Sequence, residues 1–103
     1  MAKREIIDTL KKYILLLQSE GISINKAYLY GSYLSDSAND ESDIDLMIIT
    51  ENKEDDYLAG KAWSLTRKIN SKIEPYLVEK NRFDSDEDSP LIKLVKTTGL
   101  EIA

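Results

Sequence analysis

Two aspartates stand two residues apart at the start of an apolar run. Asp43 and Asp45 open the segment Asp43–Thr50, whose remaining residues are almost continuously apolar. Such a run is typical of a β-strand, in which residues i and i+2 face the same side, so the two carboxylates lie side by side. Like charges that close raise each other's pKa, and burying them is costly unless a cation lies between them. The pair therefore predicts a divalent metal site.

A Gly-Ser turn precedes this pair. Ten residues separate Gly31-Ser32 from Asp43, and the turn follows the short β-rich run Lys26–Tyr30. Glycine lets a backbone approach a ligand closely, and Ser32 offers a hydroxyl and an amide where a brief helix could begin. The chain contains neither a Walker A loop nor a Gly-x-Gly-x-x-Gly sequence. A phosphate-binding turn and a plain tight turn both remain open from this segment alone.

A third carboxylate, Glu74, lies near the start of the predicted strand Ile73–Val78. If that strand neighbours Asp43–Thr50, Glu74 faces the same side as the aspartates. Three carboxylates could then hold two metal ions about 3.5–4 Å apart, as in-line phosphoryl transfer requires. One ion, held by Asp43 and Asp45, would bind a triphosphate. The second would activate an attacking hydroxyl, with Glu74 as its ligand or as general base. An exposed glutamate on an edge strand is the alternative.

Composition narrows the chemistry further. The 103 residues, 42% hydrophobic and 32% charged, suit one domain over residues 1–103. With no cysteine and no histidine, the chain cannot form a disulfide, a Cys/His zinc site or a Ser-His-Asp triad. Ligands restricted to oxygen point to Mg²⁺, Mn²⁺ or Ca²⁺.

Charge and hydropathy bear on partners and location. The net charge of −5 argues against direct DNA or RNA binding, whereas a nucleotide that arrives with its metal remains compatible. No apolar run approaches the ~20 residues that span a bilayer, and the N-terminus has no signal-peptide core. We therefore expect a cytoplasmic protein without a membrane partner.

The hydrophobic pattern predicts three helices around three strands. Pro75 favours an edge position for the last strand, and Gly21 suits the end of the first helix. These elements indicate an α/β or α+β fold, a small mixed β-sheet with helices packed on one face. The helices are expected at Lys3–Glu20, Asp55–Ser71 and Leu91–Thr98, the strands at Lys26–Tyr30, Asp43–Thr50 and Ile73–Val78, and an acidic loop at Asn81–Ser89.

Four aromatic residues could stack on a nucleobase. Core packing is the better interpretation for Tyr28, Tyr30 and Trp63. Tyr33 lies just past the Gly-Ser turn and is the candidate nucleotide-binding aromatic.

The combined pattern resembles a known family. Gly-Ser, ten residues and then Asp-x-Asp, within Ser42-Asp43-Ile44-Asp45-Leu46, is similar to the minimal nucleotidyltransferases (MNT) of the DNA polymerase β superfamily. The resemblance spans about Ala27–Val78. It implies the polymerase β-like fold, ATP or another nucleoside triphosphate, Mg²⁺, and transfer of a nucleoside monophosphate with release of pyrophosphate.

The resemblance also implies roles and a partner. Gly31 and Ser32 would contact the triphosphate, Asp43 and Asp45 would bind metal, and Glu74 would be the third carboxylate. Many stand-alone members of this size resemble the antitoxin of HEPN/MNT toxin–antitoxin pairs, which adds AMP to a tyrosine of the HEPN toxin.

The chain departs from the family pattern after the turn. The family often has a small residue, a basic residue and a glycine there, whereas this chain has Leu34-Ser35-Asp36. Positive charge near the phosphates is therefore reduced, which leaves the rate and the nucleotide preference open. The alternative is a catalytically lapsed MNT-fold module that neutralises a partner protein by occupying it. An antibiotic-modifying enzyme would need a further domain. A homo-oligomer is compatible with the sequence, which does not specify the oligomeric state.

Overall fold

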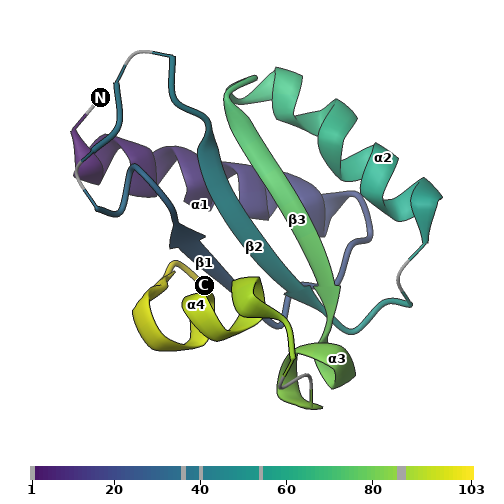
Figure 1. Ribbon diagram of the computed structural model, residues 1–103. Coiled ribbons are helices and arrows are strands. Elements are labelled where there is room, and N and C mark those ends of the chain that lie inside the picture. The colour runs from purple at the N-terminus through teal and green to yellow at the C-terminus, as the bar shows by residue number, and fades with distance from the viewer. Residues whose placement is uncertain (1, 36, 40, 54, 86–87) are drawn as a thin grey trace.

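The computed structural model describes residues 2–35, 37–39, 41–53, 55–85 and 88–103. These residues form one mixed sheet and four α-helices (Figure 1). The elements in chain order are α1 (Lys3–Ser19), β1 (Lys26–Tyr30), β2 (Ile44–Thr50), α2 (Asp56–Leu65), a 3₁₀ turn (Thr66–Lys68), β3 (Ile73–Glu79), α3 (Lys80–Ser85), α4 (Pro90–Thr98) and β4 (Leu100–Glu101).

The sheet has the strand order β3-β2-β1-β4. β1 pairs antiparallel with both β2 and β4, while β2 and β3 run parallel. The parallel pair requires a crossover, which α2 supplies. β3 lies at an edge, as Pro75 predicted, and β2 is hydrogen-bonded on both sides. The order places the start of β2 and the start of β3 at the same end of the sheet, next to the end of β1.

Helices cover both faces of the sheet. α1 passes behind the sheet in Figure 1 and α4 lies in front of it. The face toward α1 and α2 buries the larger core, which includes Leu29, Leu46 and Ile73. The mixed α+β fold is confirmed, but the expectation of helices on one face holds only for α1 and α2. The opposite face of β2 and β3 is also apolar and needs cover, which α3 and α4 provide. This smaller core comprises Met47, Ile49, Val78, Phe83, Ile92 and Val95.

The first helix ends as the sequence predicted. Gly21 has a φ of +88°, which an L side chain rarely adopts. Its N–H donates to the Gln18 carbonyl at 3.1 Å, and the Ile22 N–H donates to the Leu17 carbonyl at 3.0 Å. These two bonds form a Schellman motif and satisfy the last carbonyls of α1.

The second helix is shorter than expected. Asp55 caps its start by accepting a hydrogen bond from the Leu58 N–H at 2.6 Å. After Leu65 the chain tightens into the 3₁₀ turn instead of continuing as α-helix to Ser71. The Thr66 carbonyl accepts from both the Ile69 and Asn70 N–H groups, which closes that turn.

The C-terminal region contains two elements that the sequence pattern did not predict. α3 occupies part of the expected acidic loop. Phe83 anchors this helix to the smaller core, where its ring stacks on Tyr28 with ring centroids 5.7 Å apart. β4 adds two residues beside β1. α4 was predicted, and Ser89 caps it by accepting from the Ile92 N–H at 3.2 Å. Among the described residues, no helix combines the length and the hydrophobicity that crossing a bilayer requires.

Candidate active site

Strand pairing brings the predicted carboxylates together. In the parallel β2–β3 register Asp45 lies opposite Glu74, and in the antiparallel β1–β2 register it also lies opposite Tyr30. The Ile44 N–H donates to the Lys72 carbonyl at 2.8 Å, so the strand pairing continues up to the position before Glu74. The predicted adjacency of the two strands is therefore confirmed.

The three acidic groups are electrostatically coupled. A side-chain hydrogen bond between Glu74 and Asp43 is the largest cause of the raised pKa of Glu74, followed by burial and by repulsion from Asp43 and Asp45. Two carboxyl groups can share such a bond only while one of them carries a proton. Burial, and then the charge of Asp43, raise the pKa of Asp45. Burial and neighbouring negative charge thus both favour the protonated forms of Asp45 and Glu74.

Tyr30 shares this face of the sheet. Burial, followed by the charges of Asp45 and Glu74, raises the pKa of Tyr30 to about 12. Its ring packs against the smaller core, as predicted, but its position opposite Asp45 also makes it a wall of the acidic cluster. Sequence reasoning missed this second aspect, although the alternation of Tyr28, Leu29 and Tyr30 just before Gly31 signals which face Tyr30 occupies.

Gly31 is required by its contact with Asp45. Its φ is +80°, and a Cβ at this position would collide with the Asp45 carboxylate oxygen Oδ2. The Gly31 carbonyl accepts from the N–H groups of Leu34 and Ser35, each at 3.1 Å, so a single helical turn follows. The turn and the acidic strand start are therefore in direct contact, and any larger residue at position 31 would require the Asp45 carboxylate to move.

The turn leaves donors available for a ligand. The Ser32 hydroxyl and the N–H groups of Ser32 and Tyr33 have no intramolecular hydrogen-bond partner among the described residues. The Tyr33 ring packs against the larger core, and its hydroxyl is 3.5 Å from the Asn39 carbonyl that accepts from it. Contact of Gly31, Ser32 and Tyr33 with a nucleotide stays a prediction.

The structure describes Leu34 and Ser35, two of the three residues at which the chain departs from the family pattern after the turn. Leu34 packs against the larger core, and its carbonyl accepts a hydrogen bond from the Lys3 Nζ of α1 at 3.2 Å. Asp36 lies outside the described residues. A shallow cavity of about 440 Å³ separates the turn from α4. It is lined by Gly31, Leu34, Ser35, Leu94 and Thr98, and no sequence signal linked α4 to the turn.

The three acidic side chains supply the donor set for a metal ion. Asp43, Asp45 and Glu74 offer only oxygen ligands, and the charge of Asp43 raises the pKa of both Asp45 and Glu74. Within the described part of the chain, no three acidic side chains are already spaced as a metal cage. The residues suit a hard divalent cation by chemistry and by strand position, and an ion would have to draw the side chains closer together.

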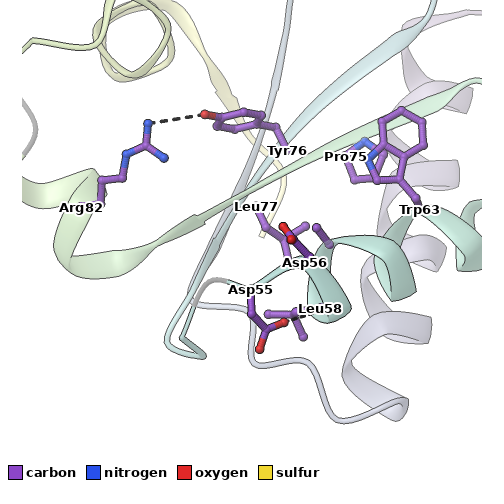
Figure 2. Close-up of a pocket in the computed structure, with 9 residues that line it drawn as sticks. Asp55, Asp56, Leu58, Trp63, Pro75, Tyr76, Leu77 and Arg82 are labelled. Atoms are coloured by element: carbon purple, nitrogen blue, oxygen red, sulfur yellow. Dashed lines mark hydrogen bonds between the residues drawn. The ribbon is translucent and has the colours of Figure 1, made fainter.

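Trp63 corrects one expectation. Core packing was predicted for this residue, but 46% of it is exposed, and it lines a groove between α2 and β3 (Figure 2). The helical stripe that faces the core runs through Ala62 and Leu65, and Trp63 lies one residue off that stripe.

The fold has counterparts among solved structures. A candidate nucleotidyltransferase from Sulfolobus solfataricus has a TM-score of 0.61 at 16% identity, over 84% of this chain and 78% of that one. A toxin–antitoxin structure with AMP-PNP has a TM-score of 0.63 at 22% identity, over 89% and 71%. A toxin–antitoxin MntA-HpeT mutant, with two Asp-to-Glu substitutions two positions apart, has a TM-score of 0.54 at 20% identity, over 100% and 73%. At these identities the likeness shows the fold.

The sequence itself places the chain in a family. No curated protein matches it. The family model for polymerase beta nucleotidyltransferases matches residues 5–94, which includes β1, β2, β3 and the three carboxylates. The chain belongs to the polymerase beta nucleotidyltransferase family.

Proposed function

We propose that residues 1–103 act as a single Mg²⁺-dependent domain that transfers a nucleoside monophosphate, AMP from ATP, to a hydroxyl of a partner protein. The observation that carries the proposal is the parallel register that sets Glu74 opposite Asp45, with Asp43 bonded to Glu74 and Gly31 against Asp45. Three acidic groups beside a turn with free N–H donors suit a metal–triphosphate complex.

Asp43, Asp45 and Glu74 would hold the metal ions. When bound, Mg²⁺ supplies positive charge that neutralises the triphosphate and the charge developing on the leaving group. The N–H groups of Ser32 and Tyr33, with the Ser32 hydroxyl, would donate to the terminal phosphates. These donors are fixed by the turn, so little order would be lost on binding.

In the transfer step, Glu74 acts as the general base. The acceptor oxygen forms a bond to the α-phosphorus while the bond from that phosphorus to the β-phosphate bridging oxygen breaks, and pyrophosphate leaves. The acceptor proton passes to Glu74 as general base, once Glu74 has given up any proton that it shares with Asp43. A Glu74→Gln variant would keep a polar side chain but lose this proton acceptor.

The partner is proposed from the structural neighbours. Two of them are toxin–antitoxin structures, and one of these contains the nucleotide AMP-PNP. By this likeness the chain would be the MNT antitoxin and a HEPN toxin would carry the acceptor hydroxyl. A neighbouring gene that encodes a small helical protein would supply the natural candidate.

One observation favours the second candidate, a catalytically lapsed module that neutralises its partner by binding alone. The stretch from Gly31 to Ser42 contains no lysine or arginine, so the turn itself offers no cationic side chain to the phosphates. Binding without transfer would then be the whole activity.

The test is incubation of the purified chain with α-labelled ATP, Mg²⁺ and the product of the neighbouring gene. Label on the partner is expected with the wild type and is expected to vanish with Asp43→Asn/Asp45→Asn, whose circular dichroism should remain that of a folded protein. Tight binding without label would support the lapsed module. Full labelling by the double variant would show that the assigned site is wrong.

A further inference from the structure

We propose that the acceptor protein docks in the groove between α2 and the free edge of β3, through a positively charged segment that carries the reactive hydroxyl to Glu74. The inference rests on the proposed function and adds to it the docking surface and the chemistry of the partner. It uses residues outside the acidic cluster.

The groove is a distinct feature of the surface. Its volume is about 420 Å³, within the range of pockets that bind small ligands. Figure 2 shows Trp63 of α2 beside Pro75 of β3, with Asp56 near the start of α2. On the other side, Tyr76 accepts a hydrogen bond from Arg82 Nη2 at 3.5 Å. Trp63 and Tyr76 are 46% and 38% exposed, so two aromatic rings are available to a partner.

The groove reaches the free edge of β3 next to the acidic cluster. Leu77 faces α2 and the larger core, whereas Glu74 alternates with Val78 toward the smaller core, so a segment in the groove must pass over this edge to reach Glu74. Pro75 and Tyr76 follow Glu74 directly in β3, and Tyr76 shares the face of Glu74 because they are two residues apart. Along a strand this separation is roughly 7 Å, less than the length of an extended peptide of a few residues. A segment lying in the groove could therefore place a hydroxyl at Glu74.

The two flanks of the cluster differ in how open they are. On the β1 side, the turn at Gly31 touches Asp45, and α4 stands beyond it across the cavity that includes Leu94. On the β3 side, the described residues provide no further strand, since β3 pairs only with β2. The acceptor side of the site is therefore the edge that the groove follows.

The negative charge at the rim of the groove favours a positively charged partner segment. Asp55 and Asp56 are exposed at the rim, and neither forms an ion pair within the described ranges of the chain. The residues that line the groove include two aspartates and one arginine, Arg82, and the chain as a whole carries a charge of −5. A lysine or arginine of the partner would be attracted by the two carboxylates and could lie over the Trp63 ring. A nucleic acid, which carries phosphates, would be repelled by the same rim.

The experiment uses two synthetic peptides of about 12 residues, each with a serine and a tyrosine at its centre. One has lysine and arginine on both flanks, and the other has glutamate at the same positions. Binding is followed by fluorescence anisotropy of labelled peptide, and transfer by α-labelled ATP with Mg²⁺. The basic peptide is expected to bind and the acidic one is not. Trp63→Ala should weaken binding roughly tenfold and Asp56→Asn about threefold.

Tyr57→Ala is the matched control, because Tyr57 is an aromatic residue of the same helix that is 77% exposed and does not line the groove. Its binding of the basic peptide should equal that of the wild type. Equal binding of both peptides, or equal losses from Trp63→Ala and Tyr57→Ala, would overturn the docking proposal.

The same measurements separate this proposal from the proposed function. Asp43→Asn/Asp45→Asn should still bind the basic peptide while transferring no label. Peptide binding that depends on Trp63 without any transfer by the wild type would refute the catalytic function and leave the docking surface intact. If the wild type transfers label and Trp63→Ala does not change the KM for peptide, the catalytic function stands and the docking surface is refuted.

Discussion

Gly31 and Asp45 form the closest contact between the two halves of the sequence motif. A missing Cβ lets the turn lie against the Asp45 carboxylate, so the phosphate-binding turn and the first acidic residue of β2 are positioned by each other. The contact thus explains why glycine is needed there, beyond its ability to adopt a positive φ.

Substitution of two glycines separates the cost of a positive φ from the cost of displacing the Asp45 side chain. Gly31 and Gly21 both have positive φ, but a Cβ at Gly21 would meet nothing within 4 Å. We expect Gly21→Ala to cost about 1–2 kcal/mol from backbone strain alone. Gly31→Ala should cost about 1–3 kcal/mol more, because the Asp45 side chain must move. Urea unfolding measures both, and equal costs would mean that Asp45 yields freely.

The residue scale is also where sequence reasoning went furthest. Asp43, Asp45 and Glu74 could be named because carboxylates beside apolar strand residues are costly and therefore informative. Tyr30 and Leu94 could not be assigned to the site, because their positions follow from strand register and from the docking of α4. The alternation of Tyr28, Leu29 and Tyr30 indicates a shared face for Tyr28 and Tyr30, but pairing with Asp45 and the docking of α4 depend on long-range contacts.

At the scale of elements, one buried hydroxyl joins the two helices of the larger core. Tyr13 of α1 donates to the Ala62 carbonyl of α2 at 2.6 Å, and its side chain is fully buried. Burial raises the pKa of Tyr13 above its ordinary value of 10.0. The bond thus fixes α2, and with it the groove residue Trp63, against α1.

Tyr13→Phe should reveal this bond through pH. At pH 7 the variant should be less stable by about 1 kcal/mol, the net value of a hydrogen bond. Above pH 10 the unfolded wild type releases the Tyr13 proton while the folded state retains it, so wild-type stability falls by up to about 1.4 kcal/mol per pH unit from this group. The variant lacks this loss, whereas both proteins keep the contribution of Tyr30.

Chemical denaturation at pH 7, 9, 10.5 and 11.5 tests the expectation. The difference in stability between the two proteins should stay constant up to pH 9, shrink by pH 10.5 and reverse sign by pH 11.5. A constant gap at every pH would show that Tyr13 ionises as easily in the folded chain as in the unfolded one.

Helices and strands were predicted best where a single local sequence pattern defined them. β1 was predicted with its observed bounds, and β2 to within one residue, because apolar runs bounded by glycine or polar residues define them. α3 and β4 were missed because they are short and gain stability from tertiary contacts, Phe83 on Tyr28 and the pairing of Leu100 with Leu29. The end of α2 was misplaced because the helical pattern continues where the backbone tightens at Thr66.

For the molecule as a whole, the sheet divides two cores, and the acidic cluster lies on the face of the smaller one. A ligand that neutralises this cluster should stabilise the entire fold, because the three acidic groups repel one another in its absence. The fold and the function are therefore linked through the same charges.

Thermal unfolding with Mg²⁺ and a non-hydrolysable ATP analogue measures that link. At ligand concentrations of about 100 times Kd, stability should rise by about 2.7 kcal/mol, and a domain of this size should then melt roughly 10–20 °C higher. Asp43→Asn/Asp45→Asn should not respond, and EDTA should reverse the shift in the wild type. A comparable shift in the double variant would place the bound metal elsewhere.

The central position of β2 has a consequence for motion. Its backbone amides and carbonyls are bonded to β1 and β3, and Ile44 and Leu46 to Thr50 are buried. Deuterium should therefore reach the β2 amides only through global opening, while the nine-residue α4 exchanges through local opening. β2, which begins beside the acidic cluster, would then remain ordered while α4, across the cavity from Gly31, opens locally. Product could therefore leave without any rearrangement of the residues that bound it.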